Sequence, residues 1–289
     1  GTRLQIYAEI SNNQHFLSHF IPFFISTCAS RVFYLALVVT IPFFMRKFAH
    51  MITGNDNFHQ RYKRHLMLPQ VGEEGQRKLC NSSIAIIGAG GLGSPVALYL
   101  AAAGIGHLRI IDNDRVDLSN LQRQVIHTTG DVDKEKAISA KEKLAAINPD
   151  VEVESVCEYF STENASALLN GCDIAIDATD NLGSKFLIND SCVALGLPFV
   201  HGAINQFSGN VMTVLPGTAT LRDLFPSATS DMKTSSCDGV LGAIPGIIGS
   251  IQAAEALKYV LGIGELLVNK VLTFDALTMT FCKFNVTHR

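Results

Sequence analysis

The sequence predicts an α/β protein with a Rossmann-like nucleotide-binding fold. Helices are expected on both faces of a mainly parallel sheet that antiparallel strands extend. Short apolar runs of strand length alternate with helical periodicity between residues 84 and 203. The first run leads into the glycine pattern GAGGLG at residues 88–93, and the second ends at Asp112. Strand, glycine turn, helix, strand and acid follow one another in the order of a dinucleotide-binding unit.

Each element of this first unit has its own signal. Ile84–Ile87 is a β-branched run bounded by glycine and too short for a helix, so it is predicted as a strand. Leu92–Ala103 is rich in small residues and is followed by Gly104, which is typical of a helix and its end. Leu108–Ile111 is the second predicted strand.

Glycines shape the predicted turn. Gly88 and Gly90 can adopt backbone angles closed to other residues, so the chain can pass close to a phosphate. Gly93 lets the helix pack tightly on the sheet, and the helix N-terminus offers unpaired N–H groups to an anion. Asp112 is placed to accept hydrogen bonds from ribose hydroxyls. The pattern alone is often only a tight turn, but its flanking elements favour nucleotide binding.

The remaining elements continue the alternation and then change character. The helices are expected at Phe58–Leu79 (a pair broken at Pro69 and Gly72), Lys134–Ile147, Thr162–Leu169, Ser184–Leu195 and Ile244–Leu261. The further strands are expected at Val151–Val156, Asp173–Thr179, Pro198–Ala203, Gly209–Leu215 and Val271–Ala276. We expect the last two strands to be antiparallel, with a loop at Pro216–Gly239 between them.

Composition excludes several classes of protein. The 289 residues carry a formal net charge of −3, so no general affinity for nucleic acid is expected. The seven cysteines form no C-x-x-C pair and no regular framework, which favours a reducing, cytoplasmic location over disulfide bonding.

Residues 1–55 form a hydrophobic extension unlike the rest of the chain. Its longest uncharged runs, 20–30 and 32–45, are shorter than the roughly 20 residues that span a bilayer as a helix. A membrane anchor or signal-like segment, an apolar helical hairpin and translated sequence foreign to the native enzyme are the alternatives. We favour the third, and expect no membrane association.

The segment after Asp112 indicates which nucleotide is bound. It is polar and dense in hydrogen-bond donors, and Asn120, Arg123 and Lys136 suit a triphosphate, which carries more charge than a pyrophosphate diester. Asp180 follows a predicted strand at the same sheet edge, where a carboxylate suits Mg²⁺.

Six motifs in order resemble the ThiF/MoeB/HesA family of ubiquitin-activating-like adenylating enzymes. They are RYKRH (61–65), GAGGLGS (88–94), D-x-D-x-V-x-x-S-N-L-Q-R-Q (112–124), Lys136, ATDN (178–181) and SCDGVLG (236–242). The resemblance runs from about Phe58 to the end of the chain, so residues 56–289 are interpreted as one ThiF/MoeB-type adenylating domain.

The resemblance implies ATP-dependent adenylation of the C-terminal glycine of a ubiquitin-like sulfur carrier protein that ends in Gly-Gly. The product would serve thiamine or molybdopterin synthesis, and both branches stay open. ATP and Mg²⁺ are the implied cofactors. A homodimer and a sulfur donor protein are the implied partners, besides the carrier.

The resemblance also assigns site residues. Catalytic roles fall to Asp180, Arg123, Lys136, Cys237 and Arg64, the last reaching the ATP of a neighbouring subunit, and Asp180 is the Mg²⁺ ligand. Nucleotide binding falls to Gly88, Gly90, Gly91, Gly93, Asp112, Asp114, Ser119, Asn120, Gln122, Arg123, Lys136, Asp180 and Asn181.

One departure concerns zinc. The family usually carries two C-x-x-C pairs, but residues 217–226 contain no cysteine, and the sequence shows no second pair before Arg289. Four such ligands are needed for a structural site, so zinc is predicted absent. The alternatives to an adenylating enzyme are a pseudo-enzyme that only binds a ubiquitin-like partner and an NAD-dependent oxidoreductase.

Overall fold

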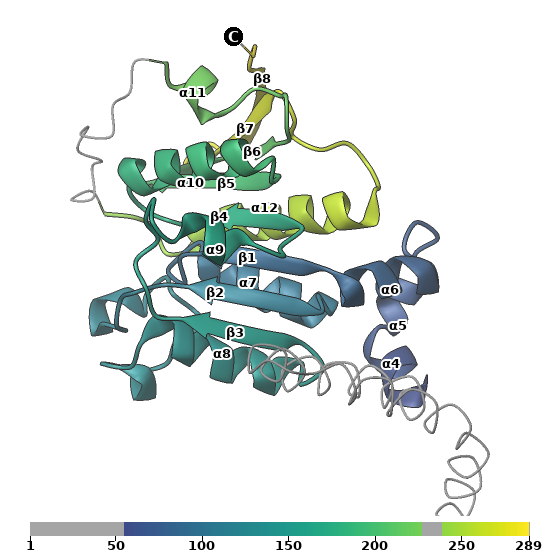
Figure 1. Cartoon of the computed structure of the whole chain (residues 1–289). Coiled ribbons are helices and arrows are strands. Elements are labelled where there is room, and N and C mark those ends of the chain that lie inside the picture. Colours follow the sequence, from purple (N-terminus) through teal and green to yellow (C-terminus); the bar gives the residue numbers. More distant parts are fainter. Residues whose placement is uncertain (1–54, 227–238, 289) are drawn as a thin grey trace, which may run out of the picture. The chain divides into compact units, whose positions relative to one another are not determined.

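The computed structural model describes residues 55–226 and 239–288 (Figure 1). The chain separates into two compact units, Gly1–Arg61 and Tyr62–Arg289. The described part of the first unit is the helix α4 (Asn55–Arg61). The predicted extension at residues 1–55 therefore lies almost wholly outside the described residues, and its interpretation stays a prediction.

Within the described residues, the second unit is built on an eight-stranded sheet. From one edge to the other the strands are β3 (Glu152–Val156), β2 (His107–Ile111), β1 (Ser83–Ile87), β4 (Ile174–Asp177), β5 (Phe199–Asn205), β6 (Ser208–Val214), β7 (Lys270–Asp275) and β8 (Thr280–Asn285). Neighbouring strands from β3 to β5 are parallel, and those from β5 to β8 are antiparallel. The predicted fold class is confirmed.

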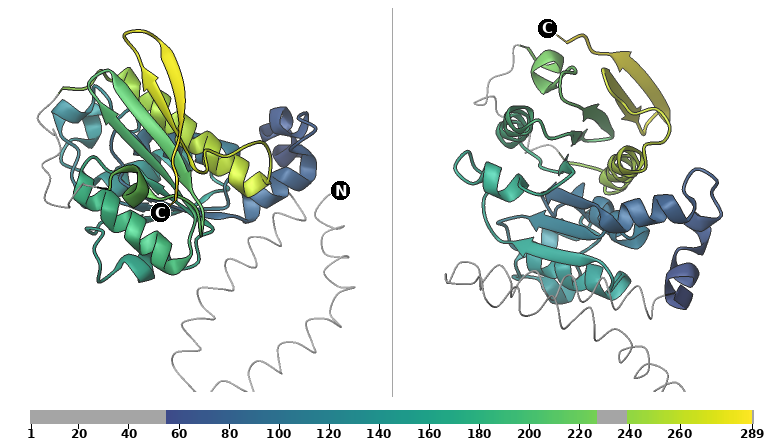
Figure 2. Two further views of the ribbon diagram at one scale, coloured as in Figure 1. Left: turned by 90° about the horizontal axis from the view of Figure 1, so that it is seen from above. Right: turned by 45° about the vertical axis from the view of Figure 1, so that its right-hand side comes forward.

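Helices cover both faces of this sheet. The helices of the second unit are α5 (Lys63–Leu66), α6 (Gly72–Asn81), α7 (Gly93–Ala103), α8 (Lys136–Ile147), α9 (Ala165–Leu169), α10 (Leu182–Leu195), α11 (Leu221–Leu224) and α12 (Ala243–Leu261). Apolar side chains of α7, α8 and α12 form one buried cluster, and those of α9 and α10 form another. Both views in Figure 2 place α10 and α12 on opposite sides of the strands.

The central strands read as continuous apolar runs because both of their faces are covered. In β1, Ile84 and Ile86 belong to the α7 and α12 cluster, whereas Ala85 and Ile87 belong to the α10 cluster. Each such fully buried isoleucine contributes about 1.5–3 kcal/mol relative to an exposed one. Burial on two faces therefore explains why this run was recognisable as a strand.

Strand register brings three chain turns to one sheet edge. Ile87 lies opposite Ile111 on one side and opposite Asp177 on the other. Because these strands are parallel, the residues that follow each of them emerge at the same edge. That edge is where ligands bind in open α/β sheets.

Several predicted boundaries were wrong in detail. The helix pair expected at residues 58–79 consists of α4, α5 and α6, and α9 begins three residues later than expected. The predicted loop at residues 216–239 contains the short helix α11, and the strand β8 was not predicted. Among residues 55–226 and 239–288, no helix is long and apolar enough to cross a bilayer.

Candidate active site

The glycine turn after β1 is held by close backbone contacts. Gly88 has a φ of +101°, and its N–H donates to the carbonyl of Ile111 at 2.8 Å. A Cβ on Gly88 would lie 2.6 Å from the carbonyl oxygen of Ala178, and a Cβ on Gly93 would lie 1.9 Å from that of Gly88. Only glycine fits at these two positions. Gly90 does not share the left-handed conformation, so the expected unusual backbone angle is found at Gly88 alone.

Gly90 and Gly91 have looser surroundings. A Cβ on Gly90 would approach the Nε2 of Gln124 at 3.4 Å, and one on Gly91 would approach Pro245 at 3.2 Å. The Oε1 atom of Gln124 is buried and has no hydrogen-bond partner among the described residues. Its amide therefore lies beside the glycine turn with an acceptor available to a bound molecule. Sequence reasoning did not single out Gln124.

The acids after β2 and the lysine that begins α8 meet at the glycine turn. Asp112 accepts hydrogen bonds from the N–H groups of Ala89 (2.7 Å) and Asp114 (2.8 Å). Burial raises the pKa of Asp112 above its ordinary value, against the lowering effect of nearby Lys136. The Lys136 ammonium donates to Asp114 at 2.8 Å. The structure thus brings together three of the predicted site residues.

His127 holds the other side of this turn. One ring nitrogen lies 2.9 Å from the carbonyl oxygen of Ala89, and the other lies 2.9 Å from the Ser139 hydroxyl. Burial lowers the pKa of His127, which favours the neutral ring. Sequence reasoning missed this residue, because a lone histidine in a connecting segment has no distinctive spacing.

The donor-rich segment forms a short 3₁₀ helix at Leu118–Asn120. Asp117 caps it by accepting from the N–H of Ser119 at 2.7 Å, and the Asn120 side chain accepts from the N–H of Asp117 at 3.3 Å. The hydrogen bonds from Ser119 lower the pKa of Asp117. Arg123 donates to the carbonyl of Ser119 at 3.3 Å. Three predicted residues therefore share one turn, which Asp117 organises.

Gln122 lies where this segment meets α12. A Cβ on Gly242, the residue before α12, would be 2.3 Å from the Gln122 carbonyl oxygen. The close approach places the backbone of Gln122 against the start of that helix.

Asp180 and Asn181 lie in the turn between β4 and α10. Asn181 caps α10 by accepting from the N–H of Ser184 at 2.8 Å. Asp180 is exposed, with the Asn181 amide 3.5 Å from its carboxylate. This turn adjoins the glycine turn, since Ala178 contacts Gly88 and its N–H donates to the carbonyl of Ile87 at 2.9 Å.

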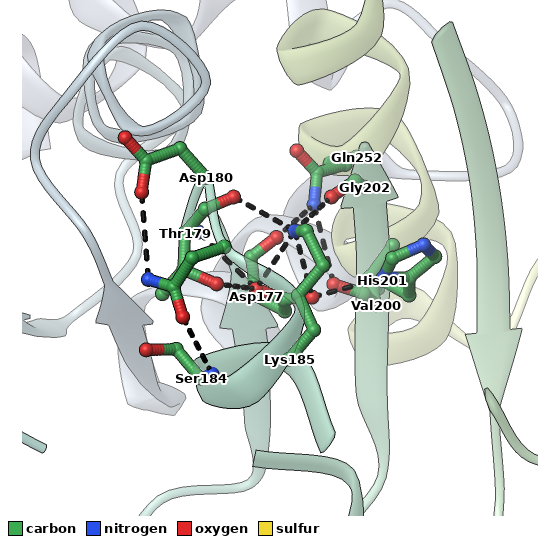
Figure 3. Close-up of polar contacts among 10 residues, drawn as sticks. Asp177, Thr179, Asp180, Ser184, Lys185, Val200, His201, Gly202 and Gln252 are labelled. Atoms are coloured by element: carbon green, nitrogen blue, oxygen red, sulfur yellow. Dashed lines mark hydrogen bonds and ion pairs between the residues drawn. The ribbon is translucent and has the colours of Figure 1, made fainter. Parts of the chain in front are cut away.

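A buried polar cluster that sequence reasoning missed lies below the Asp180 turn (Figure 3). The Lys185 ammonium lies 3.2 Å from the Asp177 carboxylate, and the His201 ring lies 2.8 Å from that same carboxylate. All three side chains are almost fully buried. Burial raises the pKa of Asp177, but Lys185 and the hydrogen bond from His201 more than offset this and hold the pKa at about 2.

The surroundings of His201 favour its neutral ring. Burial lowers the pKa of His201, and the nearby Lys185 charge lowers it further, against the raising effect of the hydrogen bond to Asp177. Gln252 completes the surroundings by donating to the carbonyls of Asp177 (2.8 Å) and Val200 (3.2 Å). The cluster therefore holds one buried negative charge balanced by one buried positive charge.

The roles of two further predicted catalytic residues, Arg64 and Cys237, are not tested by these contacts. Arg64 is exposed on α5, and the described contacts that build the nucleotide turn do not include it. Cys237 lies outside the described residues. Neither assignment is tested, so both stay predictions.

Residues 55–226 and 239–288 contain no group of three or more His, Cys, Asp or Glu side chains placed to hold a metal ion. The prediction about zinc stays a prediction. Mg²⁺ needs less from the protein, because it commonly takes one or two carboxylates together with water and phosphate oxygens. The exposed Asp180 carboxylate at the sheet edge fits that requirement.

Comparison with known proteins agrees with this geometry. The model of the ThiF family matches residues 62–289. The SAMP-activating enzyme E1 of Haloferax volcanii is 45% identical over 223 residues, covering 76% of this chain and 83% of that protein. The sulfur carrier protein adenylyltransferase of Thermus thermophilus is 45% identical over 234 residues, covering 78% and 86%.

A further relative is longer than the matched region. A probable molybdopterin-synthase adenylyltransferase of Porphyra purpurea is 44% identical over 234 residues, covering 80% of this chain and 61% of that protein. Among solved structures, E. coli MccB with ATP gives a TM-score of 0.70 at 22% identity, covering 82% of this chain and 73% of that one. That likeness concerns the fold alone.

Proposed function

This chain belongs to the ThiF family, and on that premise we propose that it adenylates the C-terminal glycine of a ubiquitin-like sulfur carrier protein with ATP. The carrier would end in Gly-Gly and serve thiamine or molybdopterin synthesis. The names of relatives from Thermus thermophilus and Porphyra purpurea, which are 45% and 44% identical, support this reaction and carrier class.

The observation that carries the proposal is the meeting of three turns at one sheet edge. The glycine turn contacts Ala178 through Gly88, and the N–H of Ala89 donates to Asp112 at 2.7 Å. Lys136 lies within the same group through its ion pair with Asp114. A glycine turn, a buried acid, a cation and an exposed carboxylate therefore come together from segments distant in sequence, which supports a binding site for ATP.

The chemistry asks little of the protein beyond positioning. A carboxyl terminus has a pKa near ~3.5, so it is already an anionic nucleophile at neutral pH and needs no general base. Its oxygen attacks the α-phosphorus, and pyrophosphate leaves. The protein aligns the two groups and neutralises the developing charge.

Each role falls to a residue of this chain. Asp112 would accept from the ribose hydroxyls, and Arg123 and Lys136 would face the phosphates. An ammonium has three donors, so Lys136 can keep the 2.8 Å contact with Asp114 while it binds a phosphate oxygen. Asp180 would hold Mg²⁺, which neutralises phosphate charge when bound.

The finer assignments concern partners and location. We propose a homodimer in which Arg64 reaches the neighbour's phosphates. The exposed Met67 (63%) and Leu68 (49%), which lie three and four residues after Arg64, support a protein interface there. Cys237 and a sulfur donor protein would serve the later transfer of sulfur. The free cysteines of the described part support a reducing compartment, which we take to be the cytoplasm.

The test is isotope exchange between pyrophosphate and ATP with a purified Gly-Gly-ending carrier. We expect exchange only when the carrier and Mg²⁺ are both present. Carrier binding without exchange would favour the pseudo-enzyme. Nicotinamide binding without ATP binding would favour the oxidoreductase.

A further inference from the structure

The Lys185 ammonium is the centre of the buried cluster below the Asp180 turn. Its side chain is 6% exposed, and that of Asp177 is 0% exposed. Besides Asp177, the ammonium donates to the carbonyls of Thr179 at 2.7 Å and Gly202 at 2.6 Å. A lysine has three N–H donors, so these partners use all of them inside the protein.

These contacts fix the chain on both sides of Asp180. Thr179, the residue before it, gives its carbonyl to Lys185 and donates its N–H (3.1 Å) and hydroxyl (2.7 Å) to Asp177. Lys185 itself belongs to α10, the helix that begins after Asn181. The Lys185 ammonium therefore links Thr179, the residue before Asp180, to α10, the helix that follows it.

The side chain of Asp180 takes no part in this cluster. It is exposed, and Figure 3 shows its carboxylate pointing away from the Lys185 ammonium. Contacts of Thr179 and Lys185 thus hold the turn in place, while the Asp180 carboxylate itself stays outside the buried cluster.

A buried ion pair is a weak source of net stability, because desolvation of both charges offsets most of their attraction. Apolar side chains of similar size would fill the same space at comparable stability. The ion pair differs from apolar residues in one respect, because its ammonium donates hydrogen bonds to the Thr179 and Gly202 carbonyls.

We propose that Lys185 is a positioning residue of the adenylation site: with its charge balanced by Asp177, it fixes the turn that places the Asp180 carboxylate against Mg²⁺ and the ATP phosphates. The inference rests on the proposed function. It predicts that loss of Lys185 weakens the metal-dependent part of ATP binding and leaves the metal-free part unchanged.

The experiment is calorimetric titration of ATP, with and without Mg²⁺, together with melting temperature and pyrophosphate exchange. Lys185→Met removes the ammonium. Because this leaves a buried carboxylate unpaired, the double variant Asp177→Asn with Lys185→Met removes both charges and keeps a foldable protein available. Lys185→Arg restores the charge and the donors.

The matched control is Lys258→Met. Lys258 also pairs with a buried carboxylate, Glu255, and donates to the carbonyl of Glu265 at 2.5 Å. It lies 15 residues beyond Ala243, which at the helical rise is about 22 Å along α12 from the end that adjoins Gln122. Its loss should lower the melting temperature and leave ATP binding unchanged.

We expect the double variant to bind metal-free ATP as the unaltered protein does, to bind Mg²⁺–ATP roughly 10-fold more weakly, and to exchange about 100-fold more slowly. Lys185→Arg should recover much of both. Unchanged metal-dependent binding in a folded double variant would overturn the inference while the proposed function stands. Absence of ATP binding by the unaltered protein would overturn both.

Discussion

Replacement of Gly88 by alanine should destabilise the second unit without touching any charged residue. At a φ of +101° an alanine is strained, which costs about 1–3 kcal/mol. Its Cβ would also lie 2.6 Å from the Ala178 carbonyl oxygen, and relief of such a contact by backbone movement costs roughly 1–3 kcal/mol more. We therefore expect a loss of about 4 kcal/mol in the free energy of unfolding.

The assay is urea unfolding followed by circular dichroism, with thermal melting as a second measure. For a unit of this size, a loss of about 4 kcal/mol lowers the melting temperature by roughly 10 °C. The unfolding slope should stay constant, because the surface exposed on unfolding does not change.

Gly90→Ala is the matched control for this prediction. Gly90 has no positive φ, and its Cβ would meet only the side-chain amide of Gln124, at 3.4 Å, which is an ordinary van der Waals contact. We expect a stability loss below about 1 kcal/mol. If phosphates approach the backbone at Gly90, ATP affinity should nevertheless fall about 10-fold, or about 1.4 kcal/mol. If Gly88→Ala is as stable as the unaltered protein, the steric account of the turn is refuted.

Three other predictions concern the site and its surroundings. Asp180→Ala and Arg64→Ala should each fold normally and lose pyrophosphate exchange by about 10³-fold. Mixed dimers of the two variants should regain part of this activity. If subunit exchange is demonstrated and no activity returns, Arg64 does not act across an interface. Because the folded pKa of Asp177 is about 2, below the ordinary value of 3.8, its stabilisation is present above about pH 4 and is lost as the pH falls toward 2. Between about pH 4 and pH 2 the double variant Asp177→Asn with Lys185→Met should therefore lose about 2 kcal/mol less free energy of unfolding than the unaltered protein. Parallel curves of unfolding free energy against pH for the two proteins would contradict this. Elemental analysis should find no stoichiometric zinc, with no effect of chelator on melting, whereas one zinc per chain would disprove the prediction from the missing cysteine pairs.

Much of the fold was predictable because its signals are local. The strand at Ile84–Ile87 is buried on both faces, so its residues are uniformly apolar. The helix α7 ends at Gly104, which adopts a left-handed conformation that glycine favours. The strand β8 was missed because all six of its residues are exposed, so no buried face imposes a pattern on the sequence. Its pairing partner β7 determines its structure, and pairing leaves little trace in composition.

The residues of the candidate site also differ in whether the sequence could predict their positions. Asp112 and Asp180 could be placed because each follows a strand end, and strand ends in a parallel sheet share one edge. The ion pair of Asp177 and Lys185 could not be placed, since one member closes a strand and the other lies on a helix. The third member of the buried cluster, His201, is 24 residues from Asp177 and meets it only because β4 and β5 are neighbours.

The most direct test of the central claim is the mass of the carrier protein after incubation with this chain and Mg²⁺–ATP. We expect a new species heavier by one adenylate at the carboxyl terminus, formed in a single turnover and absent when the terminal glycine is removed from the carrier. Asp180→Ala should give none of it. A carrier of unchanged mass, under conditions in which both proteins are folded and bind one another, would contradict the assignment of this chain as an adenylating enzyme.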